Sequence, residues 1–492
     1  MKKGDRDMNK QIKHLIISVI CSVIIVNLLC VNTAMAKGNI KSFKNKLDNW
    51  APELLKRYNI PGTSIGIIQN GKVVYILNYG MADKSKGKEV NDNTIFQVGS
   101  VSKTLTACGV MHLVEEGKIK LDDPAEKYLT RWHLPASKFN KKDVTIRRLL
   151  SHTAGLSVHG YGGTKPGKKL DTLEESLSKG VKIIVKPGSE FLYSGGGYTL
   201  LQLIIEEVIK QSFDKYMYEE ILKPFGMEHS TYSNNITNPN MSKAYGVLGQ
   251  TSPNYNFAEE AAAGLKSTIP DFSKFILAMM DGSNGETRGR NVLKGESIDI
   301  MFTPVRSNYG FGFFYNKLSD GNTLIWHGGA NMGGWRAQYG MIPEKKDGLI
   351  IFTNSDNGQN LTDDIFNYWE QYETGDMPQQ YYTNKKLRNY FLYAAAALVV
   401  LLGIYILFFA VKLKSGKRMF FSKNMKKSYV KLSIRLIILL LFTSIWCAFF
   451  YILDVASVMP YGFNKITCAV VLWSVVLFIT DFFPKVSSSL KK

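Results

Sequence analysis

The segment Thr94-Ile-Phe-Gln-Val-Gly-Ser-Val-Ser-Lys-Thr104 decides how this chain of 492 residues is interpreted. A strand-like apolar stretch meets Gly99, and helical spacing of apolar residues predicts a helix over 101–116. Ser100 and Lys103 stand three positions apart, on one face of that helix, so the amine can reach the hydroxyl. A serine at a helix N-terminus also has a backbone N–H suited to a developing oxyanion.

A structural explanation fits the same residues equally well, namely a helix-capping serine followed by a solvated lysine. A second nucleophile pattern, G-x-S-x-G at residues 62–66, follows Pro61 and enters a strand instead of a helix, so Ser64 is interpreted as a strand residue. The Ser-x-x-Lys spacing alone does not decide, because it also occurs in turns, polar stretches and the tail, at Ser85, Ser176, Ser212, Ser428, Ser488 and Ser489.

Two further segments accompany Ser100. Tyr193-Ser-Gly-Gly-Gly197 places a tyrosine at a turn before a helix predicted over 200–210. Trp326-His-Gly-Gly-Ala330 places two glycines where the backbone must approach another group closely.

Taken together, these segments resemble the penicillin-binding protein and class C β-lactamase family of serine hydrolases. The resemblance runs from about residue 61 to residue 354. It includes the connecting phrases Leu149-Leu-Ser-His-Thr-Ala-Gly-Leu156, Pro187-Gly-Ser-Glu-Phe-Leu-Tyr193 and Pro224-Phe-Gly-Met227. It implies an α+β, β-lactamase/transpeptidase-like fold.

The resemblance also implies roles for individual residues. Ser100 attacks a carbonyl and forms an acyl-enzyme, while Tyr193 accepts its proton and Lys103 supports the phenolate. The backbone N–H groups of Ser100 and Ala330 form the oxyanion hole. No cofactor is expected.

The substrate-binding positions depart from the family pattern twice. Gly195 stands where an asparagine is usual, and His327 stands where a lysine is usual, beside Gly328 and Gly329 that line the substrate strand. Recognition of a β-lactam carboxylate is therefore expected to be weak, whereas acyl transfer is retained. Alternatively, His327 is a turn histidine packed by its neighbour, and His152 is interpreted as a scaffold residue.

Strand patterns flank the helical middle of this region. Asn70-Gly71 predicts a type I′ hairpin, and strands are predicted over 309–314, 337–342 and 349–353. Strands at both ends with helices between them predict an antiparallel sheet flanked by helices and joined to a helical region.

Both ends of the chain carry long apolar runs. Residues 1–36 have the charged, apolar and small-residue order of a signal peptide, with an uncleaved anchor as the alternative. We expect the hydrolase domain over 37–385 and a membrane domain over 386–492, with three spans near 390–411, 436–453 and 465–483, the last being the weakest. The loop between the first two is basic without an acidic residue, which predicts a cytoplasmic loop and an extracytoplasmic catalytic domain.

Composition narrows the class of protein further. The net charge of +20 lies mostly beside the apolar runs, so a nucleic-acid partner is not expected. Neither Cys-x-x-Cys nor His-Glu-x-x-His spacing occurs, so no metal site is predicted. Cys108 is expected to be a buried apolar residue.

The sequence thus predicts a membrane-anchored, extracytoplasmic serine hydrolase of D-amino-acid peptide or ester bonds in peptidoglycan-type substrates, with β-lactams as further candidate ligands and the lipid bilayer as its other partner. Two alternatives stay open: a cell-envelope sensor that is acylated or binds a ligand, and a catalytically degenerate family member.

Overall fold

The computed structural model of the chain describes residues 39–235, 238–420, 426–448 and 463–483. The predicted signal peptide, residues 1–36, lies outside this part. Helices of the described catalytic region are α2 (Ile40–Tyr58), α3 (Ser102–Glu115), α4 (Ile146–Leu150), α5 (Leu173–Gly180), α6 (Gly195–Ile209), α7 (Phe213–Tyr216), α8 (Glu260–Ala263), α9 (Ile269–Ala278), α10 (Gly295–Phe302) and α11 (Gly358–Thr374).

Seven strands form one antiparallel sheet. They are β1 (Gly62–Gln69), β2 (Lys72–Asp83), β3 (Lys88–Glu89), β8 (Phe314–Lys317), β9 (Thr323–Asn331), β10 (Trp335–Ile342) and β11 (Asp347–Thr353). Their order is β3-β2-β1-β11-β10-β9-β8, so the first and last strands of the domain meet where β1 pairs with β11. Asn70 and Gly71 have φ angles of 50° and 74°, which confirms the predicted hairpin turn.

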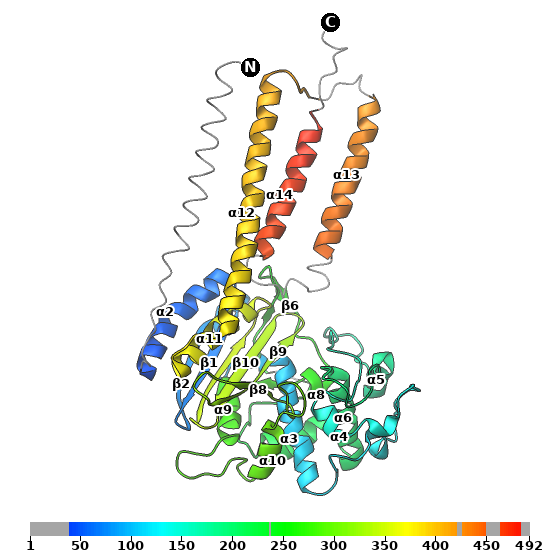
Figure 1. Cartoon of the computed structure of the whole chain (residues 1–492), viewed down its shortest axis with the longest axis vertical. Coiled ribbons are helices and arrows are strands. Elements are labelled where there is room, and N and C mark those ends of the chain that lie inside the picture. The colour runs from blue at the N-terminus through cyan, green and yellow to red at the C-terminus, as the bar shows by residue number, and fades with distance from the viewer. Residues whose placement is uncertain (1–38, 236–237, 421–425, 449–462, 484–492) are drawn as a thin grey trace.

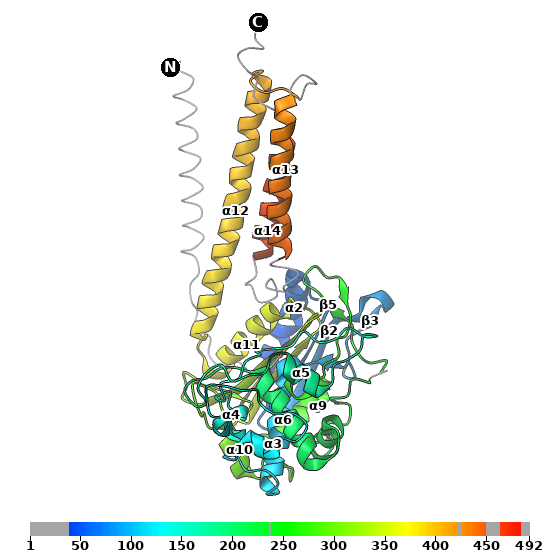
Figure 2. The same ribbon diagram turned by 90° about the vertical axis from the view of Figure 1, so that its right-hand side faces the viewer.

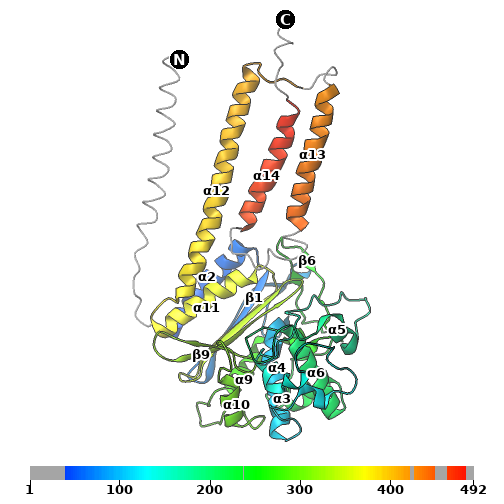
Figure 3. The same ribbon diagram turned by 45° about the vertical axis from the view of Figure 1, so that its right-hand side comes forward.

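Helices cover both faces of this sheet (Figures 1 and 3). On one face α2 and α11 pack through an apolar cluster that includes Leu47, Ile351 and Trp369. On the other face lie α9 and the helical region. Two short strand pairs, β4 (Phe96–Gln97) with β7 (Lys266–Ser267) and β5 (Ala244–Tyr245) with β6 (Thr251–Ser252), join that region to the sheet. The predicted α+β architecture is confirmed.

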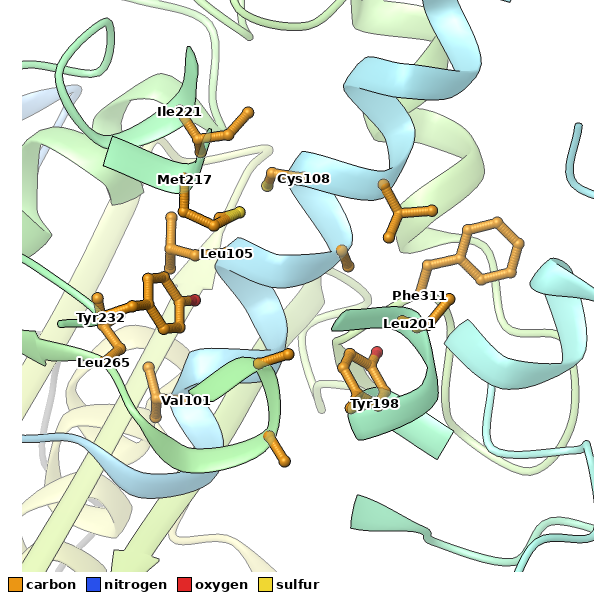
Figure 4. Close-up of a cluster of buried hydrophobic side chains, with 14 of the residues drawn as sticks. Val101, Leu105, Cys108, Tyr198, Leu201, Met217, Ile221, Tyr232, Leu265 and Phe311 are labelled. Atoms are coloured by element: carbon orange, nitrogen blue, oxygen red, sulfur yellow. The ribbon is translucent and has the colours of Figure 1, made fainter. Parts of the chain in front are cut away.

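Helix α3 lies at the centre of the helical region (Figure 4). Val101, just before it, and Leu105 and Cys108 are fully buried among side chains of α6 and neighbouring segments. Every residue from Ser102 to Met111 is buried, because a helix surrounded on all sides has no solvent-exposed face. Cys108 is a buried apolar residue, as predicted. The burial of α3 fixes the backbone from which Lys103 projects and the turn before it that carries Ser100.

Two predicted boundaries are wrong. Residues 309–313 do not form a strand, because Gly312 has a φ of +81° and turns the chain onto α3, where its carbonyl accepts a hydrogen bond from the Thr104 hydroxyl at 3.0 Å. Strand β8 begins only at Phe314. Helix α6 begins at Gly195 instead of near residue 200, because the Ser194 hydroxyl accepts a hydrogen bond from the backbone N–H of Gly197 and caps it.

Three helices lead away from the catalytic domain: α12 (Gln379–Lys414), α13 (Lys426–Cys447) and α14 (Phe463–Asp481) (Figures 1 and 2). Only α12 and α14 are, within the described ranges, long and apolar enough to cross a membrane, which corrects the prediction of three spans. The apolar part of α13 covers only Ser433–Cys447, and the rest of the span predicted near 436–453 lies mostly outside the described residues. The last span, predicted to be the weakest, is one of the two that qualify.

Candidate active site

Ser100 lies in the 3-10 turn η2 (Gly99–Val101), which leads into α3. Its hydroxyl accepts a hydrogen bond from the Lys103 amine at 3.2 Å, so the predicted contact across one helical turn is present. No capping hydrogen bond from a side chain is made at the start of either helical segment. The capping explanation for Ser100 is therefore not the one that the structure supports.

Lys103 is held in an apolar, aromatic pocket. Its side chain is buried, and its amine also donates to the Ala262 carbonyl of α8 at 2.8 Å. The amine lies 5.1 Å from the ring centre of Tyr193 and 5.6 Å from that of Tyr198. Because burial disfavours the charged amine, the pKa of Lys103 is lowered to about 7. A large fraction of the amine is therefore neutral near physiological pH and can accept a proton.

Tyr193 reaches the same hydroxyl from the segment that precedes α6. Its phenol shares a hydrogen bond with the Ser100 side chain, so three groups far apart in sequence converge on one point. Burial raises the pKa of Tyr193, and the bond to Ser100 lowers it by less. The electrostatics therefore favour a protonated phenol in the free protein over the phenolate that the resemblance implies.

A histidine that the sequence analysis assigned to the scaffold supports this tyrosine. The ring centre of His152 lies 4.2 Å from that of Tyr193, and its Nδ1 accepts a hydrogen bond from the Ser194 backbone N–H at 3.1 Å. Burial, followed by the nearby Lys103, lowers the pKa of His152 well below its usual value, so the ring is neutral. His152 belongs to the segment 149–156 that contributes to the family resemblance, but only the fold shows that it lies beside Tyr193.

Glycines allow η2 to approach the edge of the sheet. Pairing of β8 with β9 covers only 323–326, so residues 327–331 of β9 have no strand on that side among the described residues. A Cβ on Gly329 would lie 1.9 Å from the Val98 carbonyl oxygen, and a Cβ on Gly99 would lie 2.5 Å from the Ala330 nitrogen. Only glycine permits this close approach, which brings the turn that contains Ser100 next to Ala330, as the predicted oxyanion hole requires.

We expect Gly329→Ala to lower the acylation rate about 10²- to 10³-fold, since pushing β9 away removes the Ala330 donor from the carbonyl oxygen. Gly328→Ala is the matched control, because its Cβ would meet nothing closer than the Ala337 carbonyl oxygen at 3.8 Å. Pre-steady-state acylation rates of both variants test the prediction. Equal rates in the two variants would contradict the close approach at Gly329.

His327 lies in β9 and is 1% exposed. Its Nδ1 donates to the Gly328 carbonyl at 2.6 Å, and its Nε2 accepts a hydrogen bond from the Tyr309 hydroxyl at 3.3 Å. Burial, with Lys103 nearby, lowers the pKa of His327 to about 3, so the ring is neutral at physiological pH. The site therefore lacks the fixed cation that a lysine would supply at this position.

The structure explains why a glycine stands at position 195. A Cβ at this position would lie 3.1 Å from the His159 carbonyl oxygen and 3.1 Å from Cε2 of Tyr161. The Tyr161 ring thus lies beside Gly195, on the side where a larger side chain would project. Its hydroxyl accepts a hydrogen bond from Thr199 at 2.8 Å, which holds the ring there.

Restoring asparagine at this position should destabilise the protein unless the tyrosine is removed. We expect Gly195→Asn to reduce the free energy of unfolding by about 1–3 kcal/mol through overpacking against Tyr161. In the double variant with Tyr161→Ala the loss should be smaller than the sum of the two single losses. Urea unfolding of the four proteins measures this coupling, and strictly additive losses would contradict it.

Sequence patterns did not identify three groups that contact the site residues: the backbone carbonyl of Ala262 and the side chains of Tyr198 and Tyr309. Tyr198 lies five residues after Tyr193 in an apolar helix, where an aromatic residue is normally core. The contacts of Lys103 with Tyr198 and with the Ala262 carbonyl join segments more than 90 residues apart.

The chain is similar to known proteins in sequence and in fold. The family model described as "Beta-lactamase" matches residues 47–373. "Protein flp" of Staphylococcus aureus (strain MRSA252) is 25% identical over 395 residues, covering 76% of each chain. "Putative penicillin-binding protein PbpX" of Bacillus subtilis (strain 168) is 30% identical over 316 residues, covering 62% of this chain and 74% of the relative.

The solved structures include similar folds. The octameric penicillin-binding protein homologue from Pyrococcus abyssi superposes with a TM-score of 0.55 at 29% identity, covering 64% of this chain and 74% of that one. Since the family model spans well over half of the sequence and the fold agrees, the chain belongs to the beta-lactamase family of serine hydrolases.

Proposed function

We propose that this protein is an acyl-transferring serine hydrolase whose nucleophile is Ser100. The observation that supports this most strongly is the convergence of the Lys103 amine and the Tyr193 phenol on one hydroxyl. A nucleophile within hydrogen-bond reach of a base is the arrangement that covalent catalysis needs. The electrostatics described above determine which partner takes which proton.

In the proposed reaction Lys103 is the proton acceptor. Its neutral amine takes the proton of the Ser100 hydroxyl while the oxygen forms a bond to the substrate carbonyl carbon, and the Ser100 and Ala330 N–H groups stabilise the oxyanion. The phenol of Tyr193 then protonates the leaving nitrogen or oxygen as its bond to carbon breaks, and the Lys103 ammonium returns a proton to the tyrosine. Water completes the cycle by releasing the acyl group from Ser100.

The proposed substrates are D-amino-acid peptides or esters of peptidoglycan-type material. This class is an inference from the family together with one feature of the site, the neutral His327. Without a fixed cation, binding gains little from a carboxylate next to the scissile bond. We therefore propose that esters and amides without such a carboxylate are turned over faster than β-lactams, and that β-lactams acylate Ser100 slowly.

The C-terminal helices are proposed to anchor the enzyme. Helices α12 and α14 have the length and composition of membrane spans, and the basic residues after α12 favour a cytoplasmic loop. In this topology residues 1–36 direct export, residues 37–385 catalyse hydrolysis outside and residues 386–492 hold the enzyme at the membrane. Anchoring keeps the site close to polymer near the bilayer and raises its effective concentration.

A substrate panel tests the proposed function. Purified full-length protein in detergent is incubated with D-alanyl peptides, D-alanyl esters and a penicillin, and product release is measured for each. We expect turnover of an ester or peptide and little turnover of the penicillin. Absence of turnover on the whole panel, with intact ligand binding, would favour the alternative of a sensor, which Ser100→Ala would leave responsive to ligand.

A further inference from the structure

A groove lies between α12 and Trp473 of α14. Its α12 residues belong to the half of that helix that leads away from the catalytic domain (Figures 1 and 2). Its volume is about 450 Å³. The walls are apolar and the end of the groove is basic: the wall residues are Leu401, Ile404, Phe408 and Trp473, and the basic residues are Lys412 and Arg418.

Arg418 is the cation of this groove that contacts α14. Its Nη1 donates to the carbonyl oxygens of Thr480 at 3.3 Å and Phe483 at 3.1 Å, at the C-terminal end of α14. Its guanidinium lies 5.2 Å from the ring centre of Phe409. Its Nε is buried, and no described group accepts its hydrogen. The side chain as a whole is only half-buried and lines the groove, so it remains within reach of a ligand acceptor.

Neither cation of the groove is neutralised by the protein residues that the structure describes. Lys412 lies over the Phe408 ring at 5.9 Å, and no ion pair involves it or Arg418. The nearby carboxylate of Asp481 is already paired with Arg435 at 2.7 Å. Two cations with aromatic neighbours and no described counter-ion are therefore available to a multivalent anion.

The walls suit a hydrocarbon chain. Leu401, Ile404 and Phe408 are 54%, 47% and 66% exposed, so their apolar surfaces stay open along the side of α12. Such a row would be unfavourable in water but matches an acyl chain in a bilayer. One ligand that satisfies both ends of the groove carries a phosphate and an acyl chain together.

We propose that this groove binds an anionic phospholipid, with its phosphate at Arg418 and Lys412 and one acyl chain along α12. The planar guanidinium carries donors besides those on Nη1, so it can bind phosphate oxygens while Nη1 stays on α14. The bound lipid bridges α12 and α14 and stabilises the membrane bundle. The inference rests on the membrane anchoring proposed above and does not depend on hydrolysis at Ser100.

Lipid binding by the full-length protein in detergent tests this site. Phosphatidylglycerol and phosphatidylcholine are titrated separately, and bound lipid is counted by native mass spectrometry. We expect the wild type to bind phosphatidylglycerol at least about tenfold more tightly, and Arg418→Gln to lose about tenfold in affinity, as expected for one charge-assisted hydrogen bond. Lys412→Gln should lose less. Lys414→Gln is the matched control, because this exposed lysine of the same helix end does not line the groove.

Several outcomes would overturn the site. The two lipids would bind equally well, or Arg418→Gln and Lys414→Gln would lose the same affinity. Complete displacement of the lipid by inorganic phosphate at roughly 10 mM, with the lipid concentration held constant, would also overturn it. Arg418→Lys keeps the charge, so it should fold and retain intermediate binding even where the glutamine variant does not fold. If alkaline extraction releases the wild-type protein from membranes, the anchoring proposal itself fails; membrane-bound protein without lipid selectivity refutes only the lipid site.

Discussion

Removing the Ser100 hydroxyl should lower kcat on the order of 10⁶-fold, the scale seen when a serine nucleophile is deleted. The reason is that Ser100 is the only nucleophile within hydrogen-bond reach of Lys103 among the described residues. The other hydrogen-bond partner of the amine is the backbone carbonyl of Ala262. Steady-state turnover of the best substrate from the panel measures the effect in Ser100→Ala.

Ser64 offers the matched control for this variant, because it lies in the rival G-x-S-x-G pattern. Its hydroxyl donates to the Asn78 side chain at 2.6 Å within the β1–β2 hairpin, and Ser64 is 1% exposed. Ser64→Ala should lose some stability and keep the turnover of properly folded protein. If Ser64→Ala lost activity and Ser100→Ala kept it, Ser64 and not Ser100 would be the nucleophile.

Replacing Lys103 with methionine should lower kcat/KM about 10²- to 10⁴-fold, the usual contribution of a positioned base. In the wild type, kcat/KM should rise with pH around an apparent pKa of about 7, because the neutral amine is the active form. In Lys103→Met this rise should be absent. A wild-type kcat/KM that does not change between about pH 6 and pH 8 would contradict Lys103 as the base.

The same lysine makes stability depend on pH. Its pKa is about 7 in the folded protein and 10.5 in the unfolded chain, so the unfolded state binds more protons between these values. The free energy of unfolding therefore rises as the pH increases from about 7 toward 10.5, and Lys103→Met should flatten this rise.

Lys266 provides a control for removing a buried amine. It is 3% exposed, and burial lowers its pKa, but its amine donates to the carbonyls of Ser233 and Gly264 and not to Ser100. Lys266→Met should alter the pH dependence of unfolding and leave that of kcat/KM in place. A catalytic pH profile that is lost in both variants would indicate a general structural effect.

Local patterns predicted the parts of the site that lie on one element. The contact between Ser100 and Lys103 follows from helical spacing, and the hairpin at Asn70 follows from turn chemistry. The meeting of this pair with Tyr193 was implied by family resemblance alone, since no local rule joins segments about 90 residues apart.

What the sequence could not give is the electrostatic environment. A pKa depends on burial by distant segments, so the lowered pKa of Lys103 and the raised pKa of Tyr193 emerged only from the packed structure. These directions are the reason for proposing the lysine, in place of the tyrosine, as the proton acceptor. The strand predicted over 309–314 failed for a similar reason, because contact of Gly312 with α3 outweighs strand composition.

The most direct test is intact-mass spectrometry of the full-length protein during reaction with an ester substrate, followed by peptide mapping. We expect an acyl adduct on the peptide that contains Ser100, which decays as product appears and is missing in Ser100→Ala. An adduct on another residue, or steady turnover without any adduct under conditions that trap acyl-enzymes, would contradict nucleophilic catalysis by Ser100.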